Sequence, residues 1–152
     1  MLHKRKSFKK SRALNKRDKD LQRPCPFCDL AQVAEIIEQT ETMLVIRQRV
    51  PYDQFEGVVV SDHLMLIPRK HHVSLETLTD QEKIEYVTLA AKYESGDYGI
   101  YSRAKNSMTR SVEHVHTHLL ELKGPRVRRM VFIEKPYILL MSKPKRIKVA
   151  VR

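Results

Sequence analysis

Three histidines at alternate positions, His114, His116 and His118, constrain this chain more than any other feature of its sequence. The alternation continues through Thr117 and Leu119 and predicts a strand, on which side chains two residues apart share a face about 6.5–7 Å apart. Three neighbouring imidazoles disfavour one another's protonation, and the neutral form is the one that acts as a nucleophile or metal ligand. The triplet therefore indicates a site of chemistry: either a metal-binding face or a phosphate site with a histidine nucleophile.

Two cysteines, Cys25 and Cys28, form the second informative group. The basic N-terminus has no apolar block behind it, so we expect no secretory signal and a cytoplasmic protein, in which CxxC indicates a metal or redox pair. Two thiolates need two further ligands for a closed tetrahedral site. One histidine from His71-His72 and one from the triplet would complete a Cys2His2 site.

The order of the expected elements predicts an α+β fold with an antiparallel sheet. Thr79 and Glu82 have the spacing of a capping box, which begins a helix that runs toward residue 95. Apolar runs predict strands before and after that helix, because β-branched residues alternate with polar breaks. These strands are expected over 34–40, 43–49, 63–68, 98–104 and 112–122, with a loop over 51–57 and a closing hairpin over 130–142.

Positive charge is concentrated at the two ends of the chain. Of the formal net charge of +11, residues 1–23 contribute ten Lys/Arg and two Asp, and residues 142–152 contribute five Lys/Arg and no acid. We expect a domain over 24–141, a basic and disordered tail over 1–23, and a second basic tail over 142–152. Such tails either gather a polyanion such as RNA without reading its sequence or are simply solvated. No apolar run approaches the ~20 residues of a membrane span.

The segment His114-Val-His-Thr-His-Leu-Leu120 resembles the signature of the histidine triad (HIT) family, His-φ-His-φ-His-φ-φ. The preceding Ser111-Val112, the block His63-Leu-Met-Leu-Ile-Pro-Arg-Lys-His71 and the Cys-Pro-Phe-Cys knuckle also resemble the family and stand in its order. The resemblance covers about residues 24–122. It implies a HIT-like antiparallel sheet with one main helix and a small zinc knuckle.

Roles follow from this resemblance residue by residue. His116 matches the nucleophile, His118 a residue that contacts phosphate oxygens, and Ser111 a hydroxyl near the attacked phosphate. His63 matches a histidine that lines the nucleotide pocket. The resemblance implies a structural zinc ion bound by Cys25, Cys28, His71 and His114, and no catalytic cofactor. His72 is the alternative to His71 in this ligand set.

The sequence departs from the family between residues 103 and 110. Arg110 stands where the family has a glutamine, and the usual glycine is absent. Lys105 and Arg110 add positive charge where a polyphosphate would lie, and Asn106 stands near the family's asparagine at a different spacing. Together with His63, these three residues are the expected substrate-binding group.

The resemblance implies a hydrolase for a small nucleotide conjugate, of the dinucleoside polyphosphate or nucleoside phosphoramidate type. It would act through a covalent nucleotidyl-histidine. Three alternatives stay open at this point: a nucleotidyltransferase, a zinc-stabilised RNA- or ribosome-binding module, and a metalloenzyme that uses all three histidines. Family members are often dimers, so a homodimer is a further expectation.

Overall fold

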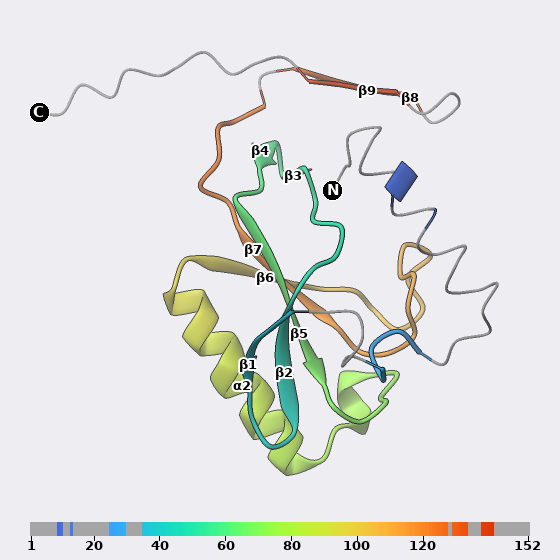
Figure 1. The fold of residues 1–152 in the computed structure, drawn as a ribbon, viewed down its shortest axis with the longest axis vertical. Coiled ribbons are helices and arrows are strands. Elements are labelled where there is room, and N and C mark those ends of the chain that lie inside the picture. Colours follow the sequence, from blue (N-terminus) through green and yellow to red (C-terminus); the bar gives the residue numbers. More distant parts are fainter. Residues whose placement is uncertain are drawn as a thin grey trace, which may run out of the picture.

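A five-stranded antiparallel sheet forms the centre of the structure, a computed structural model that describes residues 9, 10, 13, 25–29, 35–127, 129–133 and 138–141 (Figure 1). Almost all of the expected basic tails, 1–23 and 142–152, lies outside these residues. The expected α+β class is confirmed. The strands lie in the order β1 (Ile36–Gln39), β2 (Met43–Arg47), β5 (Asp62–Pro68), β7 (Thr117–Glu121) and β6 (Tyr98–Ser102).

Two short hairpins lie outside this sheet. The expected closing hairpin is confirmed as β8 (Met130–Ile133) and β9 (Ile138–Met141), which pair with each other as a separate ribbon. The expectation of a loop over 51–57 is wrong at its end, because β3 (Gln54–Phe55) pairs with β4 (Val58–Val59). The turn between them uses two consecutive positive φ angles, 48° at Glu56 and 75° at Gly57. Glycine adopts this conformation at little cost, which makes the tight turn possible.

The main helix α2 (Asp80–Ser95) covers one face of the sheet and follows the short 3-10 helix η2 (Leu75–Thr77). The expected capping box is present: the Thr79 hydroxyl accepts from the Glu82 backbone N–H at 3.2 Å, and the Glu82 carboxylate accepts from the Thr79 N–H at 2.7 Å. Among the described residues no helix is long and apolar enough to cross a bilayer. The helix packs on a cluster that includes Met43, Val45, Leu64, Leu66 and Leu119.

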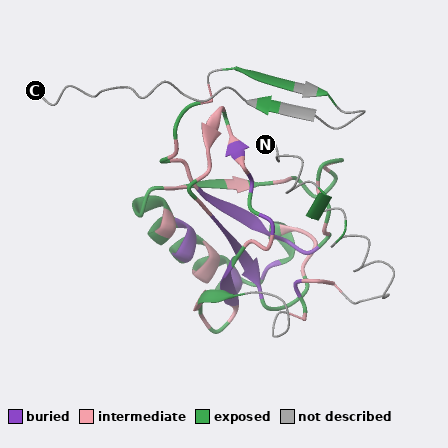
Figure 2. Ribbon diagram, turned by 45° about the horizontal axis from the view of Figure 1, so that its top comes forward, coloured by how far each residue is buried: buried purple, intermediate pink, exposed green. Residues whose placement is uncertain are grey.

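The opposite face of the sheet is also covered, which explains why the central strands are apolar at successive positions. There Phe27, from the cysteine turn, packs on a second cluster of Leu44, Ile46, Met65 and Ile67. Figure 2 shows the resulting band of buried residues through the middle of the sheet. In the β5–β7 register Met65 lies opposite His118, and His63 opposite Leu120, so both histidines belong to this second face.

The carboxylate of Glu85 ties α2 to the turn between β1 and β2. It accepts from the Thr42 backbone N–H at 3.0 Å, from the Thr42 hydroxyl at 2.8 Å and from the Thr40 hydroxyl. These bonds favour the ionised form, and with Gln81 on the other oxygen they lower the pKa of Glu85 to about 2.

Glu85→Gln is therefore expected to lower stability at neutral pH but to matter progressively less in acid. A carboxyl whose pKa falls on folding stabilises the native state above its unfolded pKa, and this contribution is lost as the pH falls toward about 2. Urea denaturation of wild type and variant at steps between pH 7 and 3 measures the difference. Glu94→Gln, which removes a charge from an exposed position of the same helix, is the control. A difference between wild type and Glu85→Gln that is constant with pH would contradict the assignment.

Candidate functional site

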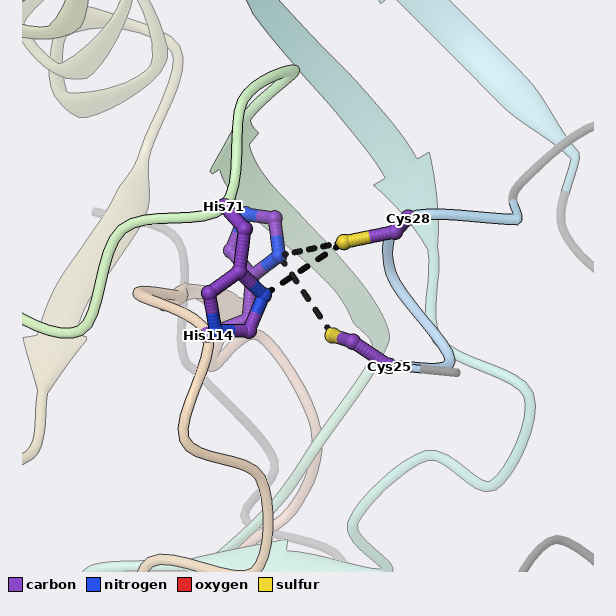
Figure 3. Close-up of side chains that lie close together, drawn as sticks. All are labelled: Cys25, Cys28, His71 and His114. Carbon is purple, nitrogen blue, oxygen red and sulfur yellow. Dashed lines mark hydrogen bonds between the residues drawn. The ribbon is translucent and has the colours of Figure 1, made fainter. Parts of the chain in front are cut away.

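Cys25, Cys28, His71 and His114 come together beside the second face of the sheet (Figure 3). The backbone N–H of Cys28 donates to the carbonyl of Cys25 at 2.9 Å and closes the turn, while Phe27 between them is buried against the sheet. The aromatic side chain anchors the turn, so both thiols point toward the histidines. His71 follows the Pro68 end of β5.

The four ligand atoms have the spacing of a tetrahedral metal site. All lie within 4.8 Å of one another. The Cys25 Sγ–His114 Nδ1, Cys28 Sγ–His114 Nδ1 and Cys28 Sγ–His71 Nδ1 distances are 3.5, 3.6 and 3.4 Å. Zinc bonds of about 2.3 Å to sulfur and 2.0–2.1 Å to nitrogen, at a tetrahedral angle, separate those atoms by about 3.6 Å. The donor set therefore fits a metal ion that prefers thiolate and imidazole.

The protonation of His114 suits the same role. Its Nε2–H donates to the carbonyl of Pro68 at 3.0 Å, which leaves the lone pair on Nδ1 facing the two thiols. His114 is fully buried, and burial lowers its pKa to about 4, so the ring is neutral at physiological pH. A hydrogen bond from the far nitrogen to a carbonyl is the usual way in which a ligating histidine is oriented.

His72, the expected rival of His71, turns away from this cluster toward α2. Its Nε2 lies 3.1 Å from the buried carboxylate of Glu82, and its Nδ1 lies 3.2 Å from the Thr77 hydroxyl. Its backbone carbonyl accepts from the N–H of Val115 at 2.7 Å. His72 thus connects the start of the helix to the segment that carries the triplet.

The expectation that residues 112–122 form one strand is wrong for the first half of that range. β7 begins only at Thr117, whose partners are Leu66 on β5 and Ser102 on β6. β6 ends at Ser102, and although β5 continues to Pro68, the backbone N–H of Val115 donates instead to the carbonyl of His72 at 2.7 Å. His114 and His116 therefore lie in a loop, and the three imidazoles do not share a strand face. Instead each enters a different environment.

His116 lies at a cleft of about 120 Å³. Its Nδ1–H donates to the carbonyl of His114 at 2.8 Å, so the lone pair is on Nε2. Burial, and after it the charges of Arg110 and Arg103, lower the pKa of His116 and keep the ring neutral. Three of the described residues that line the cleft are cationic and none is acidic; the full lining is Ser74, Leu75, Ser102, Arg103, Ala104, Lys105, Arg110, Val115 and His116.

His118, His63 and Tyr52 form a buried, closed ring of hydrogen bonds, to which Arg103 donates from outside. The backbone N–H of Tyr52 donates to His63 Nδ1 at 3.1 Å, so neutral His63 carries its proton on Nε2 and donates to His118 Nδ1 at 2.9 Å. His118 in turn donates from Nε2 to the Tyr52 hydroxyl at 3.1 Å, and that oxygen also accepts from Arg103 Nη2 at 3.0 Å. Burial, followed by the nearby His63, lowers the pKa of His118 to about 2, so the imidazole stays neutral.

Several solved structures are similar in fold to this chain. A HIT family hydrolase from Clostridium thermocellum is 22% identical with a TM-score of 0.51, over 67% of this chain and 95% of that one. A HIT family protein from Bacillus anthracis is 18% identical with a TM-score of 0.52, over 66% and 74% of the two chains. A hypothetical histidine triad nucleotide-binding protein from Sulfolobus tokodaii is 17% identical with a TM-score of 0.52, over 64% and 68%. This chain has the histidine triad fold. No protein-family model and no curated protein matches its sequence.

Within this HIT fold the site residues expected from the sequence are divided between four places. The cleft brings together His116, Lys105 and Arg110, whereas His63 and His118 are buried behind it and do not line it. Two of the expected residues, Ser111 and Asn106, are exposed and are not among the lining residues. The remaining expected residues are those of the Cys2His2 cluster.

Sequence reasoning missed Arg103 and Tyr52, which lie at or next to this cleft. Arg103 stands at the end of an expected strand, only two residues before Lys105. The spacing of these two basic residues could have indicated that Arg103 belongs to the same site. Tyr52 carries no comparable signal, because it reaches the histidines only through the path of the chain that leads into the β3–β4 hairpin. Tyr52 contacts His118 and Arg103 lines the cleft with His116, so both lie next to histidines of the triplet.

Proposed function

We propose that this chain hydrolyses a nucleotide conjugate through a covalent nucleotidyl intermediate on His116. One observation carries the proposal: a neutral imidazole presents a fixed tautomer at a cleft whose described lining residues include three cations and no acid. A neutral nucleophile next to positive charge suits an anionic phosphorus centre, because the cations attract the substrate without protonating the nucleophile. The similar structures include a HIT family hydrolase from Clostridium thermocellum, which supports the same proposal.

The mechanism follows from the position of that lone pair. Nε2 of His116 attacks the α-phosphorus in line, a P–N bond forms, and the bond from phosphorus to the leaving group breaks. The leaving group takes a proton from water. A second water then breaks the P–N bond, which releases the nucleoside monophosphate and returns His116 to its neutral form. Lys105 and Arg110 are proposed to bind the phosphoryl oxygens, and the carbonyl of His114 holds the imidazole in its tautomer throughout.

We further propose that Cys25, Cys28, His71 and His114 hold a structural zinc ion. Four protein ligands complete a tetrahedral site and leave no position open to substrate, so the ion would contribute folding energy rather than activate water. The ligand His114 is also the residue whose carbonyl orients His116. The metal site and the nucleophile are therefore connected through a single residue.

Intact-mass spectrometry after brief mixing tests the covalent intermediate. Purified protein is exposed separately to diadenosine tetraphosphate and to adenosine 5′-phosphoramidate, then quenched and denatured. We expect the mass of one adenylyl group on the protein with at least one of these probes, and adenosine monophosphate in solution. Peptide mapping should locate the group on His116. Turnover without any adduct, even in rapid-quench samples, would argue against the covalent route.

The fate of the intermediate separates hydrolysis from nucleotidyl transfer, which both pass through the same adduct. Isolated adenylyl-protein is diluted into buffer alone or into buffer with inorganic phosphate. We expect the same rate of loss in both, with adenosine monophosphate as the product. Formation of adenosine diphosphate from the phosphate would identify a transferase instead.

A further inference from the structure

Arg103 is a cation of the cleft whose guanidinium is held by contacts from several segments of the chain. It follows β6 and lines the cleft together with His116. Nη1 donates to the carbonyl of Thr109 at 2.7 Å, Nη2 donates to the Tyr52 hydroxyl at 3.0 Å, and the guanidinium carbon lies 5.9 Å from the centre of the Tyr101 ring. These contacts come from three different segments. Such a guanidinium can stabilise developing charge without first reorganising.

His118, which the resemblance assigns to phosphate oxygens, is directed elsewhere. Its Nε2–H, the donor such a role would need, points to the Tyr52 hydroxyl. The side chain is 2% exposed and does not line the cleft. Its Nδ1 is occupied by His63. In this arrangement the oxygen-binding role falls to donors that line the cleft beside His116, where Arg103 stands with Lys105 and Arg110.

We propose that Arg103 is a catalytic residue that binds the phosphoryl oxygens at His116, and that Tyr52 is the positioning residue through which His118 and His63 hold Arg103 in place. This proposal rests on the function proposed above. The Tyr52 hydroxyl oxygen accepts from both His118 and Arg103, so it joins the buried histidines to the cleft through hydrogen bonds. The two imidazoles then act on the reaction through Tyr52 rather than by contact with substrate.

Steady-state kinetics of Arg103→Gln and Arg103→Lys test the first half of the proposal. With the probe that the wild type turns over, we expect Arg103→Gln to lower kcat by roughly 10²–10³-fold, as for the loss of one charge-stabilising donor. Arg103→Lys should restore only part of the lost kcat, because an ammonium keeps the charge but cannot bind in the bidentate manner of the guanidinium. Arg47→Gln, which removes a guanidinium that pairs with Glu35 and Asp62 far along the sheet, is the matched control and should leave kcat unchanged.

Chemical rescue separates a role in the reaction from a role in folding. Added guanidinium ion at millimolar concentration, well below denaturing levels, should restore part of the kcat of an Arg103→Ala variant and none of that of His116→Ala. A merely structural arginine would give a variant that the ion does not rescue. Full activity of Arg103→Gln would equally overturn the proposal.

Tyr52→Phe tests the second half. Removal of the hydroxyl takes away an acceptor shared by Arg103 and His118, and we expect kcat to fall roughly tenfold to a hundredfold with KM little changed. Tyr98→Phe is the matched control, because it removes a hydroxyl that donates to Asp62 at 2.8 Å on the helix face of the sheet. If both phenylalanine variants behave alike, Tyr52 has no positioning role.

These outcomes can be told apart from failure of the proposed function. If wild type forms no adduct and turns over neither probe, the function itself is wrong. If wild type is active and His116→Ala is inactive, but Arg103→Gln and Tyr52→Phe keep wild-type kcat, then only the inference about Arg103 and Tyr52 fails.

Discussion

His116→Ala should abolish both the nucleotidyl adduct and turnover, while the protein stays folded and keeps its metal. Removal of a covalent nucleophile lowers kcat by roughly 10⁴-fold or more, because the route through the intermediate is lost. The side chain lies at the cleft, donates to the carbonyl of its neighbour His114 and packs on the rings of Phe27 and His118. It is a member of neither hydrophobic cluster, so we expect the fold to survive its loss. Intact mass, steady-state kinetics and thermal unfolding of the same preparation measure the three quantities.

His118→Ala is the informative comparison for that variant. It removes the donor to Tyr52 and the acceptor for His63, so it disturbs Arg103. It also removes the ring that packs edge-on against His116 with the centroids 5.2 Å apart, but it leaves the nucleophilic side chain in place. We expect a slower reaction, by roughly 10²–10³-fold, in which the adduct still forms. An adduct on His116→Ala protein with either probe would show that another residue is the nucleophile.

Loss of the metal should have the second largest effect, and mainly on stability. Structural zinc binds zinc-finger peptides with about 10–16 kcal/mol, as much as the whole net stability of a typical domain, about 5–15 kcal/mol. Cys28→Ser or His71→Asn is therefore expected to purify with much less than one equivalent of zinc and to unfold at a clearly lower temperature. Because His114 also orients His116, kcat should fall as well, but by less than in His116→Ala.

The neighbouring histidines provide a matched control for the metal site. His72→Asn alters the adjacent residue, whose ring contacts Glu82 and Thr77 rather than the cysteines, and it should keep its full zinc content. Mass spectrometry of metals in freshly purified protein makes the measurement. Wild type without zinc, or equal zinc loss in His71→Asn and His72→Asn, would show that the ligand assignment is wrong.

The sequence predicted those elements whose causes are local. The capping box at Thr79 begins α2, and Pro68 ends β5, because side-chain capping and the missing proline donor act within a few residues. A Cys2His2 site was expected from the CxxC spacing and the two histidine groups, but its particular histidines, His71 and His114, were chosen only through the family resemblance. Spacing along the chain says which residue types are available, but not that segments 43 and 89 residues apart meet.

What the sequence could not predict depends on contacts between distant segments. The pattern of alternating residues continues back to Val112, yet β7 starts at Thr117, because β6 ends at the opposite residue and the preceding Val115 bonds to His72 rather than to a strand. That difference places His116 at the cleft and His118 inside the sheet. The role of Tyr52 is equally non-local, since its hydroxyl receives donors from β7 and from the segment after β6.

The donor to His63 Nδ1 is the backbone N–H of Tyr52 and not its side chain, so this hydrogen bond does not depend on which side chain stands at position 52. Every amino acid except proline carries the same backbone donor, so substitution at this position removes the phenol but leaves that amide in place. In a saturation library at position 52, His63 should keep its proton on the same nitrogen in all variants but one. Homologues that have lost the tyrosine would still inherit the paired histidines in an unaltered protonation pattern, and could acquire another link to the cleft without rebuilding them.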